Sequence, residues 1–204
     1  MIYRIFSVIL FATIFTSCKA DGKVKQSNDN VISIINDGVD VFHLNTPMSS
    51  YDFTKYVSVA DTSALLSEDE TSPKNGKNVH YSNGGRLTLW QVSDTIFRIE
   101  IFSKGFKTTT GISVGMSFSD LFKMIKDRQY QFDYESDFSF CIPDENIDFE
   151  IAIPDIVNLS DEEINDLYKG KLSISTKKLK QLFVSKIIIS RFLDSGNLKI
   201  SDDF

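Results

Sequence analysis

Glycine and proline are scarce in this chain, with 10 and 4 copies among 204 residues. Disordered and low-complexity chains are typically rich in these two residues, so their scarcity argues against both classes. Hydrophobic residues make up 42% of the sequence, and 17 residues are phenylalanine. The composition therefore predicts a globular chain, long enough for one ordinary domain with a sizeable core.

The sequence also lacks a basic segment of the kind that binds nucleic acid. Its formal net charge is −6, and its lysines are scattered apart from Lys177, Lys178 and Lys180. So small a cluster is typical of the solvated face of a helix, whereas a nucleic-acid-binding surface gathers many basic residues on one side. We therefore expect an acidic, soluble surface and no nucleic-acid partner.

Motifs that would point to catalysis or a cofactor are weak as well. The chain lacks H-E-x-x-H, which binds zinc on a helix, and its G-x-S-x-G spacing, Gly111–Gly115, falls in the segment that we interpret below as a turn between a strand and a helix. Two histidines, His43 and His80, are available as general bases, and neither stands in a nucleophile motif. We predict no catalytic residue, no metal site and no cofactor, and keep a hydrolase that uses one of these histidines as an alternative.

Two further features resemble functional sites in outline. Gly115 interrupts an extended segment before a helix that Ser117 caps, but no G-K-[ST] follows, so we interpret this loop as a turn between a strand and a helix and not as a phosphate cradle. Asp148 and Glu150 share one face of a predicted strand, which is a spacing that could serve acid–base catalysis. A solvated strand face is the interpretation that we prefer for this pair.

The first 18 residues follow the plan of an export signal. Arg4 supplies a positive charge, an uncharged and mostly apolar run extends from Ile5 to Phe15, and Thr16 and Ser17 precede Cys18. This order is that of a signal peptide. The apolar run is about half of the ~20 residues that span a bilayer as a helix. We therefore predict a signal peptide at 1–17 and not a permanent transmembrane anchor.

The end of this segment, Phe15-Thr16-Ser17-Cys18, resembles the lipobox of bacterial lipoproteins. The usual first residue of that box is leucine, so Phe15 departs from the pattern, and an ordinary secreted protein cut nearby is the alternative. The resemblance implies that Cys18 carries acyl chains such as palmitate. Lys19, in place of an aspartate, implies the outer membrane of the cell envelope and not the inner one. Each buried methylene contributes ~0.8 kcal/mol, so several chains on one cysteine hold the protein firmly.

Residues 18–30 are polar and show no apolar period, which predicts a flexible tether between the lipid and the folded domain. With Cys18 lipidated, Cys141 is the remaining cysteine, and no disulfide can form within the chain. The domain must then depend on its core. Cys141 lies in a predicted strand, where we expect a buried, unreactive thiol.

The rest of the chain, 31–204, predicts a single α+β domain: an antiparallel sheet with a few short helices packed on one face. The clearest element is a hairpin of two alternating strands, 86–92 and 96–102, joined at Ser93 and Asp94. Residues 67–78 are polar and predict an exposed loop. Further strands are expected at 31–35, 39–44, 79–82, 130–134, 138–142, 147–153 and 184–192, and helices at 51–57, 118–126, 160–168 and 176–182.

Two segments of the domain share a pattern. Phe42–Tyr51 aligns without gaps to Ile112–Leu121, which suggests two related halves, 31–95 and 96–204. Residues 96–126, with the phrase GISVGMSFSDLFKMI, resemble the β-turn-helix opening of modules in β-lactamase-inhibitor-like proteins and in the small lipoprotein of the outer-membrane barrel-assembly machinery, and also uncharacterised envelope lipoproteins. The resemblance implies a shared element of the fold, and it carries over no functional residue.

These observations predict a lipid-anchored envelope protein that binds a protein partner or scaffolds an assembly without catalysis. An open sheet face, the loop at 67–78 and Trp90 are the candidate contact surfaces, although Trp90 could equally be core. The alternatives are an envelope hydrolase and a carrier of a small apolar ligand or lipid, the latter suggested by the many phenylalanines. The oligomeric state is left open.

Overall fold

The computed structural model describes residues 31–66, 70–125, 131–133, 139–142, 146–168 and 174–190. The predicted signal peptide, Cys18 and the tether lie outside these residues, as do 67–69 of the predicted loop and the tail after residue 190. None of the helices within the described ranges is long and apolar enough to cross a membrane.

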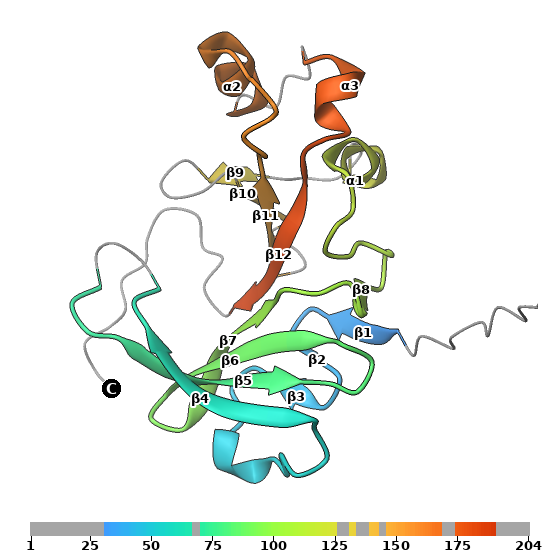
Figure 1. Cartoon of the computed structure of the whole chain (residues 1–204). Coiled ribbons are helices and arrows are strands. Elements are labelled where there is room, and N and C mark those ends of the chain that lie inside the picture. Colours follow the sequence, from blue (N-terminus) through green and yellow to red (C-terminus); the bar gives the residue numbers. More distant parts are fainter. Residues whose placement is uncertain are drawn as a thin grey trace, which may run out of the picture.

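Two β-sheets form most of the described structure (Figure 1). The small sheet has the order β3-β2-β1-β8, and its β1 and β8 pair in parallel. The large sheet has eight strands in the order β4-β5-β6-β7-β12-β11-β10-β9, all antiparallel. The small-sheet strands are β1 (Ile32–Ile35), β2 (Gly38–Val39), β3 (Phe42–His43) and β8 (Phe106–Thr108). The large-sheet strands are β4 (Ser58–Ala64), β5 (Lys74–His80), β6 (Arg86–Val92), β7 (Thr95–Ile101), β9 (Gln131–Asp133), β10 (Ser139–Ile142), β11 (Ile147–Ala152) and β12 (Phe183–Ser190).

The helices are few and short. They are the 3-10 helix η1 (Met48–Ser50) and the α-helices α1 (Phe118–Ile125), α2 (Asp161–Tyr168) and α3 (Thr176–Leu179). The prediction of an α+β fold with helices packed on one face of a sheet is therefore wrong, because strands dominate and a second sheet takes part in the fold. β4 (SVADTSA) and most of β5 (KNGKNVH) were not predicted from the sequence, because strands at an exposed sheet edge need few apolar residues.

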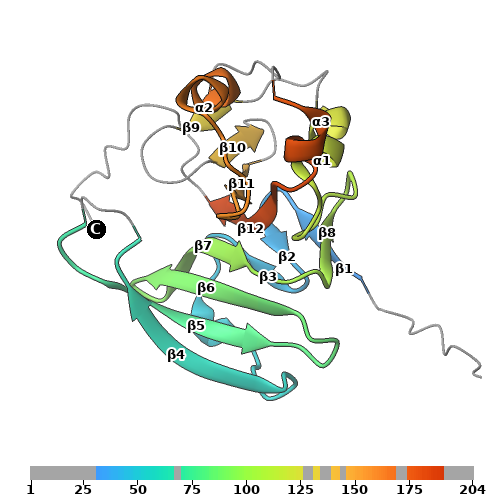
Figure 2. The ribbon, with the colours of Figure 1, turned by 45° about the horizontal axis from the view of Figure 1, so that its top comes forward.

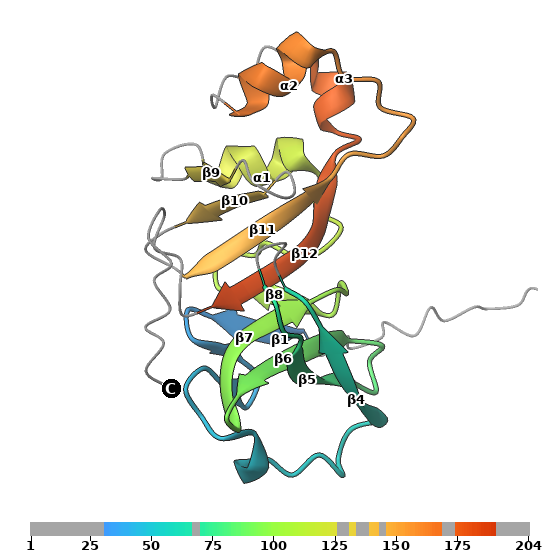
Figure 3. The ribbon, with the colours of Figure 1, turned by 90° about the vertical axis from the view of Figure 1, so that its left-hand side faces the viewer.

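A single core lies between the two sheets and extends under the helices. Leu87, Leu89, Ile99 and Ile101 of the β6–β7 hairpin are fully buried in one cluster with residues of the small sheet. The small sheet lies beneath this half of the large sheet, while α1, α2 and α3 lie towards the β9–β12 half (Figures 2 and 3). Four phenylalanines are fully buried in the same cluster: Phe42, Phe106, Phe118 and Phe149. These four phenylalanines are therefore part of the core.

A β-bulge decides which side chains of β7 point inward. The β6–β7 register shifts between Trp90, which pairs with Arg98, and Gln91, which pairs with Ile96. The bulge adds one residue and reverses the alternation locally, so Ile96 and Ile99 are both fully buried. Strict alternation along the predicted strand at 96–102 would place Ile96 and Ile99 on opposite faces of the sheet.

The predicted hairpin at 86–102 is confirmed by β6 and β7, and the helix predicted at 118–126 by α1. The helix predicted at 160–168 forms as α2, with the reciprocal bonds of a capping box: Ser160 N–H donates to Glu163 Oε2 at 2.9 Å, and Glu163 N–H donates to Ser160 Oγ at 3.2 Å. The helix predicted at 51–57 does not form. Asp52 there accepts bonds from the backbone and hydroxyl of Thr54, which favours a turn.

The two segments aligned as a repeat adopt different structures. Phe42–Tyr51 contains the two-residue β3 and the 3-10 helix η1. Ile112–Leu121 contains no assigned strand and opens the eight-residue α1. The boundary drawn between residues 95 and 96 falls inside β7, which pairs with β6 on one side and β12 on the other.

Candidate functional site

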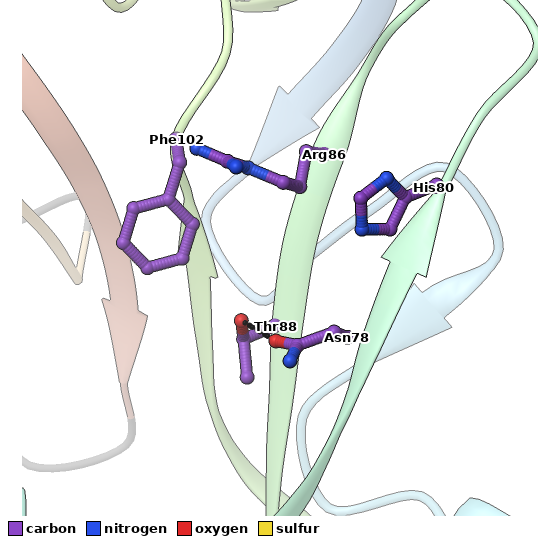
Figure 4. A pocket seen from close by; sticks show the side chains of 5 residues that line it. All are labelled: Asn78, His80, Arg86, Thr88 and Phe102. Carbon is purple, nitrogen blue, oxygen red and sulfur yellow. Dashed lines mark hydrogen bonds between the residues drawn. The ribbon is translucent and has the colours of Figure 1, made fainter. Parts of the chain in front are cut away.

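A shallow pocket of about 270 Å³ lies on the face of the large sheet that points away from the core (Figure 4). Its lining comes from three neighbouring parts of the sheet. Alternation along β5 and β6 buries Val79, Leu87 and Leu89 and turns their neighbours to the outer face. The lining residues are Asn78 and His80 of β5, Arg86 and Thr88 of β6, and Phe102 directly after β7.

The β5–β6 hairpin sets the geometry of this pocket. His80 pairs with Arg86 across the strands, and Asn78 pairs with Thr88. The hairpin closes where Tyr81 N–H donates to the Gly85 carbonyl at 2.8 Å, and Gly84 takes a positive φ of 81° that favours glycine. The turn therefore holds an imidazole and a guanidinium beside each other at the end of the hairpin.

The polar groups in the pocket are mainly hydrogen-bond donors. Thr88 Oγ1 donates to Asn78 Oδ1 at 2.7 Å, which leaves the amide NH₂ of Asn78 as the group available to a ligand. The Arg86 guanidinium lies 5.8 Å from the Phe102 ring centroid and extends toward that ring in Figure 4. None of the five lining residues is acidic. The pocket is therefore suited to an anionic group with an apolar neighbour.

A chain of ion pairs crosses the same face beside the pocket. Arg98 donates to Glu100 Oε1 from Nε at 2.9 Å and from Nη2 at 2.5 Å. Lys186 Nζ lies 3.9 Å from Glu100 Oε1 and 2.5 Å from Glu150 Oε2. Glu100 is 7% exposed at its side chain, and these cations compensate its burial. Glu150, which we interpreted as part of a solvated face with Asp148, is instead 23% exposed and paired.

A hydrolase would need a histidine that both lies in a pocket and has a carboxylate neighbour. His43 has the carboxylate neighbour, and His80 lies in the pocket. His43, in the small sheet, places Nδ1 3.5 Å from Asp37 Oδ2, but it does not line the pocket. His80 lines the pocket, whose described lining includes neither a serine nor a carboxylate. The described lining at His80 therefore does not combine a general base with an orienting carboxylate and a nucleophile. Within the described ranges, no group of three His, Cys, Asp or Glu residues is arranged to hold a metal ion.

The structure also shows the environment of the other residues singled out from the sequence, which are Trp90, Gly115, the three clustered lysines and Cys141. Trp90 is 5% exposed, so it is no surface for contact, and its indole lies against Gly76. The backbone of Gly115 donates to the Val184 carbonyl at 2.7 Å, which ties this loop to β12. Lys178 pairs with Glu163 at 2.6 Å, while Lys177 and Lys180 are exposed. Cys141 is half-buried in β10, not fully buried as expected.

An aromatic cluster with one acidic residue lies near the β5–β6 turn. Tyr81 and Tyr56 donate their phenolic O–H groups to Asp40 Oδ2 at 3.3 and 3.5 Å. Burial, followed by the Asp40 charge, raises the pKa of Tyr56 to about 12. Burial also raises the pKa of Tyr81 above its ordinary range. Edge-to-face and stacked contacts join the rings of Phe42, Tyr51, Phe53, Tyr56, Tyr81 and Phe106.

β4 forms a long open edge next to the pocket. Within the described residues, the terminal strands of the two sheets are β3 with two residues, β8 and β9 with three each, and β4 with seven. β4 contains no proline and no lysine, and its seven pairings with β5 run without a register shift. Its outer-face residues are small: Ser58, Ala60, Thr62 and Ala64.

Sequence reasoning missed the pocket because residues 74–78 of β5 were assigned to the loop at 67–78, and it missed the edge because no strand was predicted at residues 58–64. One signal was present. Gly84-Gly85 marked a turn between short extended segments, and a hairpin there places His80 opposite Arg86.

Comparison with known proteins yields a fold and no function. No family model matches the chain, and no curated protein matches it. Among solved structures, the chain is similar to the crystal structure of the uncharacterized protein yfeY from Escherichia coli, with a TM-score of 0.50 and 18% sequence identity. The match covers 78% of this chain and 99% of that one. At this identity the likeness shows a shared fold alone.

Proposed function

We propose that this chain is a lipid-anchored protein of the bacterial envelope that binds a partner protein by accepting an extended partner segment beside β4. The anchor rests on the order of charge, apolar run and small residues that ends at Cys18. The binding mode rests on one observation, the seven-residue edge of β4. Catalysis has no part in this proposal.

An edge strand exposes a row of backbone N–H and C=O groups that can pair with another chain. Proteins usually protect such edges with very short strands, lysine, proline or a bulge, and the two- and three-residue edges β3, β8 and β9 follow this practice. β4 has none of these four protections, and its one charged residue, Asp61, is paired with Lys77. Peptide recognition by strand addition uses an edge of this kind, with backbone bonds for affinity and side-chain pockets for specificity.

The surroundings of β4 also favour docking. Apart from Asp61, which pairs with Lys77, its exposed side chains are Ser58, Ala60 and Ser63, which are too small to block an approaching chain. Val57 and Leu65, which flank the strand, are 69% and 56% exposed and offer apolar contacts at both ends. A tether of the predicted length spans roughly 20 Å as a random coil, which gives the edge access to partners close to the membrane.

Site-specific photocrosslinking in native membranes tests the proposal. A photoreactive amino acid at Thr62, on β4, is expected to crosslink to a partner protein. Mass spectrometry should place the crosslinks within one continuous peptide of that partner. The same amino acid at Lys123, an exposed residue of α1, serves as the control. Capture of a second copy of this chain, or equal capture from both positions, would contradict binding of a partner at β4.

Proline substitutions distinguish the outward backbone groups of β4 from those that bond to β5. Consecutive residues of an antiparallel strand point their backbone groups alternately toward and away from the paired neighbour. One of the two variants Ala60→Pro and Asp61→Pro therefore removes only an outward donor. We expect that variant to keep its melting temperature and to lose the Thr62 crosslink, while the other loses stability. A stable proline variant that still crosslinks would rule out strand addition.

A further inference from the structure

We infer that the pocket on the outer face of β5, β6 and β7 binds a small carboxylate that carries an apolar group. The carboxylate lies at the Arg86 guanidinium, the apolar group lies against the Phe102 ring, and a carbonyl oxygen of the same ligand accepts a hydrogen bond from Asn78. This ligand enters the pocket directly from solvent. The inference therefore goes beyond the docking of a partner at β4 and does not depend on it.

Arg86 supplies the positive charge that the pocket offers to a ligand. The other cations of the large sheet have an acidic partner within 4 Å: Lys74, Lys77, Arg98 and Lys186. Arg86 forms no ion pair with the residues that the structure describes, and its cationic contact is with the Phe102 ring, at 5.8 Å from the centroid. The guanidinium that lines the pocket is thus the one whose charge is available to an anion.

One acidic residue adjoins the pocket in the sheet register, and its charge is already compensated. Glu100 of β7 pairs with Thr88 across the strands. Arg98 donates two hydrogen bonds to Glu100, and Lys186 Nζ lies 3.9 Å from the same oxygen. The Glu100 charge is held by these two cations and does not neutralise Arg86. An arriving anion therefore meets an uncompensated guanidinium.

A single permanent positive charge favours an anion with a single negative charge. Arg86 is the one lining residue that cannot lose its proton in a protein. Phosphate monoesters carry close to two negative charges at neutral pH, of which one guanidinium compensates only one. A carboxylate carries one charge, and its two oxygens match two N–H groups of a guanidinium. The charge and the geometry of Arg86 therefore both point to a carboxylate.

Backbone hydrogen bonds fix the Arg86 end of the pocket. Arg86 N–H donates to Ser103 Oγ at 2.7 Å, and Phe102 N–H donates to the Arg86 carbonyl at 3.2 Å. The guanidinium extends toward the half-buried Phe102 ring (Figure 4). A carboxylate bound there has this ring beside it, so an apolar substituent of the ligand gains contact with the aromatic face.

Asn78 provides a second point of attachment, on β5. Thr88 Oγ1 donates to Asn78 Oδ1 at 2.7 Å, so the side-chain NH₂ of Asn78 is the group that donates to a ligand. Strands lie about 4.8 Å apart, which separates this amide from a guanidinium over β6 and β7 by roughly 5–10 Å. A ligand whose carboxylate and carbonyl oxygens are about 4–5 Å apart spans that distance with a hydrogen bond of about 2.9 Å at each end.

An N-acylated amino acid with an apolar side chain combines these three groups, and so does the C-terminal residue of a peptide. N-acetyl-leucine is therefore the probe, and N-acetyl-leucinamide, which lacks the charge, is the matched control. We expect N-acetyl-leucine to bind the full folded chain with a Kd of about 1 mM, at least about fivefold more tightly than the amide. NMR titration should shift the backbone amide signals of 78–88 and Phe102.

Variants assign the binding energy to particular side chains, with the melting temperature measured for each. Arg86→Gln should remove the preference for the acid over the amide, and Arg86→Lys should keep only part of it. Phe102→Ser should remove the advantage of N-acetyl-leucine over N-acetylglycine. Lys107→Gln, which removes an exposed charge from β8, should leave both preferences intact.

A peptide distinguishes the two sources of such a carboxylate. Tighter binding of acetyl-Ala-Ser-Ala-Leu, with a free C-terminus, than of N-acetyl-leucine would identify the chain end of a partner protein as the ligand. Equal binding of the two would identify a small molecule.

Equal binding of N-acetyl-leucine and its amide would overturn the carboxylate site. A preference for the acid that persists in Arg86→Gln with an unchanged melting temperature would do the same. The stable proline variant of β4 should bind N-acetyl-leucine as the unmodified chain does, because the pocket is built by β5, β6 and Phe102. Failure of docking at β4 and failure of the pocket are therefore observed separately.

Discussion

Gly76 and Trp90 form a cross-strand pair in which the glycine makes room for the indole. A Cβ built at Gly76 would stand 2.8 Å from Trp90 Cε3 and 2.5 Å from the Leu89 carbonyl oxygen. Trp90 is 5% exposed although it lies on the outer face and outside the main core cluster. The glycine in a polar strand is thus explained by the aromatic residue opposite it.

We predict that Gly76→Ala destabilises the fold by about 1–3 kcal/mol, because the methyl group must displace either the indole or the backbone. Urea unfolding followed by Trp90 fluorescence measures this loss, and a shifted emission maximum in the folded state would report the displaced ring. Gly84→Asn is the control, because Gly84 has a φ of 81° that asparagine tolerates and no atoms within 4 Å of a Cβ. Equal effects of the two substitutions would show that the Trp90 contact is not the cause.

The buried ion pair of Glu100 and the exposed pair of Asp61 allow a matched comparison. Glu100 is 7% exposed and held by Arg98, while Asp61 is 85% exposed and paired with Lys77. Glu100→Gln should lower the free energy of unfolding by about 3 kcal/mol, because two cations lose a buried counter-charge. Asp61→Asn should cost less than about 1 kcal/mol. Chemical denaturation of both variants decides this, and similar losses would show that Glu100 is solvated in solution.

The free energy of unfolding should decrease at alkaline pH because of Tyr56. Burial and the Asp40 charge raise its pKa from 10 to about 12, so the folded chain keeps a proton that the unfolded chain releases. The resulting loss of stability therefore begins near pH 10 and continues to about pH 12, and it is absent below this window. Unfolding experiments at successive pH values, together with the ultraviolet absorbance of tyrosinate, measure both quantities.

Asp40→Asn should weaken this alkaline effect without breaking the local backbone. Asn tolerates the φ of 55° at this position, and its amide oxygen can still accept the phenolic bonds. Removing the charge lowers the pKa of Tyr56 only part of the way toward 10, since burial, the larger cause, remains. A Tyr56 titration that is unchanged in this variant would exclude Asp40 as a contributor.

The proposed lipid anchor at Cys18 has a direct test. Cys18→Ala should abolish metabolic labelling with palmitate and move the protein from the membrane fraction to the soluble fraction. Cys141→Ala, in β10, should change neither property. Continued membrane fractionation of the Cys18→Ala protein would show that the anchor lies elsewhere.

The parts of this fold that sequence predicted are those in which local pattern and burial agree. β6, β7 and α1 have clear apolar periods, because each buries one side against the core. β4 and β5 lack such a period, because an edge strand and its neighbour face solvent more widely. The bulge after Trp90 has no local signature, and the Asp52 turn replaced an expected helix.

The candidate site was hard to predict for a related reason. Its five lining residues come from β5, β6 and the end of β7, and none belongs to a motif with fixed spacing. His80 was noted as a base, but its partners depend on strand register, which only the hairpin pairing reveals. Cross-strand neighbours on an outer face leave no period in a single sequence.

β12 has a consequence for how the chain is made. It comes last among the described elements, yet it lies in the middle of the large sheet, where it pairs with β7 on one side and β11 on the other. A nascent chain that has not reached residue 183 therefore leaves the backbone groups of β7 and β11 that face β12 unpaired. The large sheet can form completely only when synthesis is nearly finished. Premature termination before β12 would leave both of these strands unpaired and so favour aggregation.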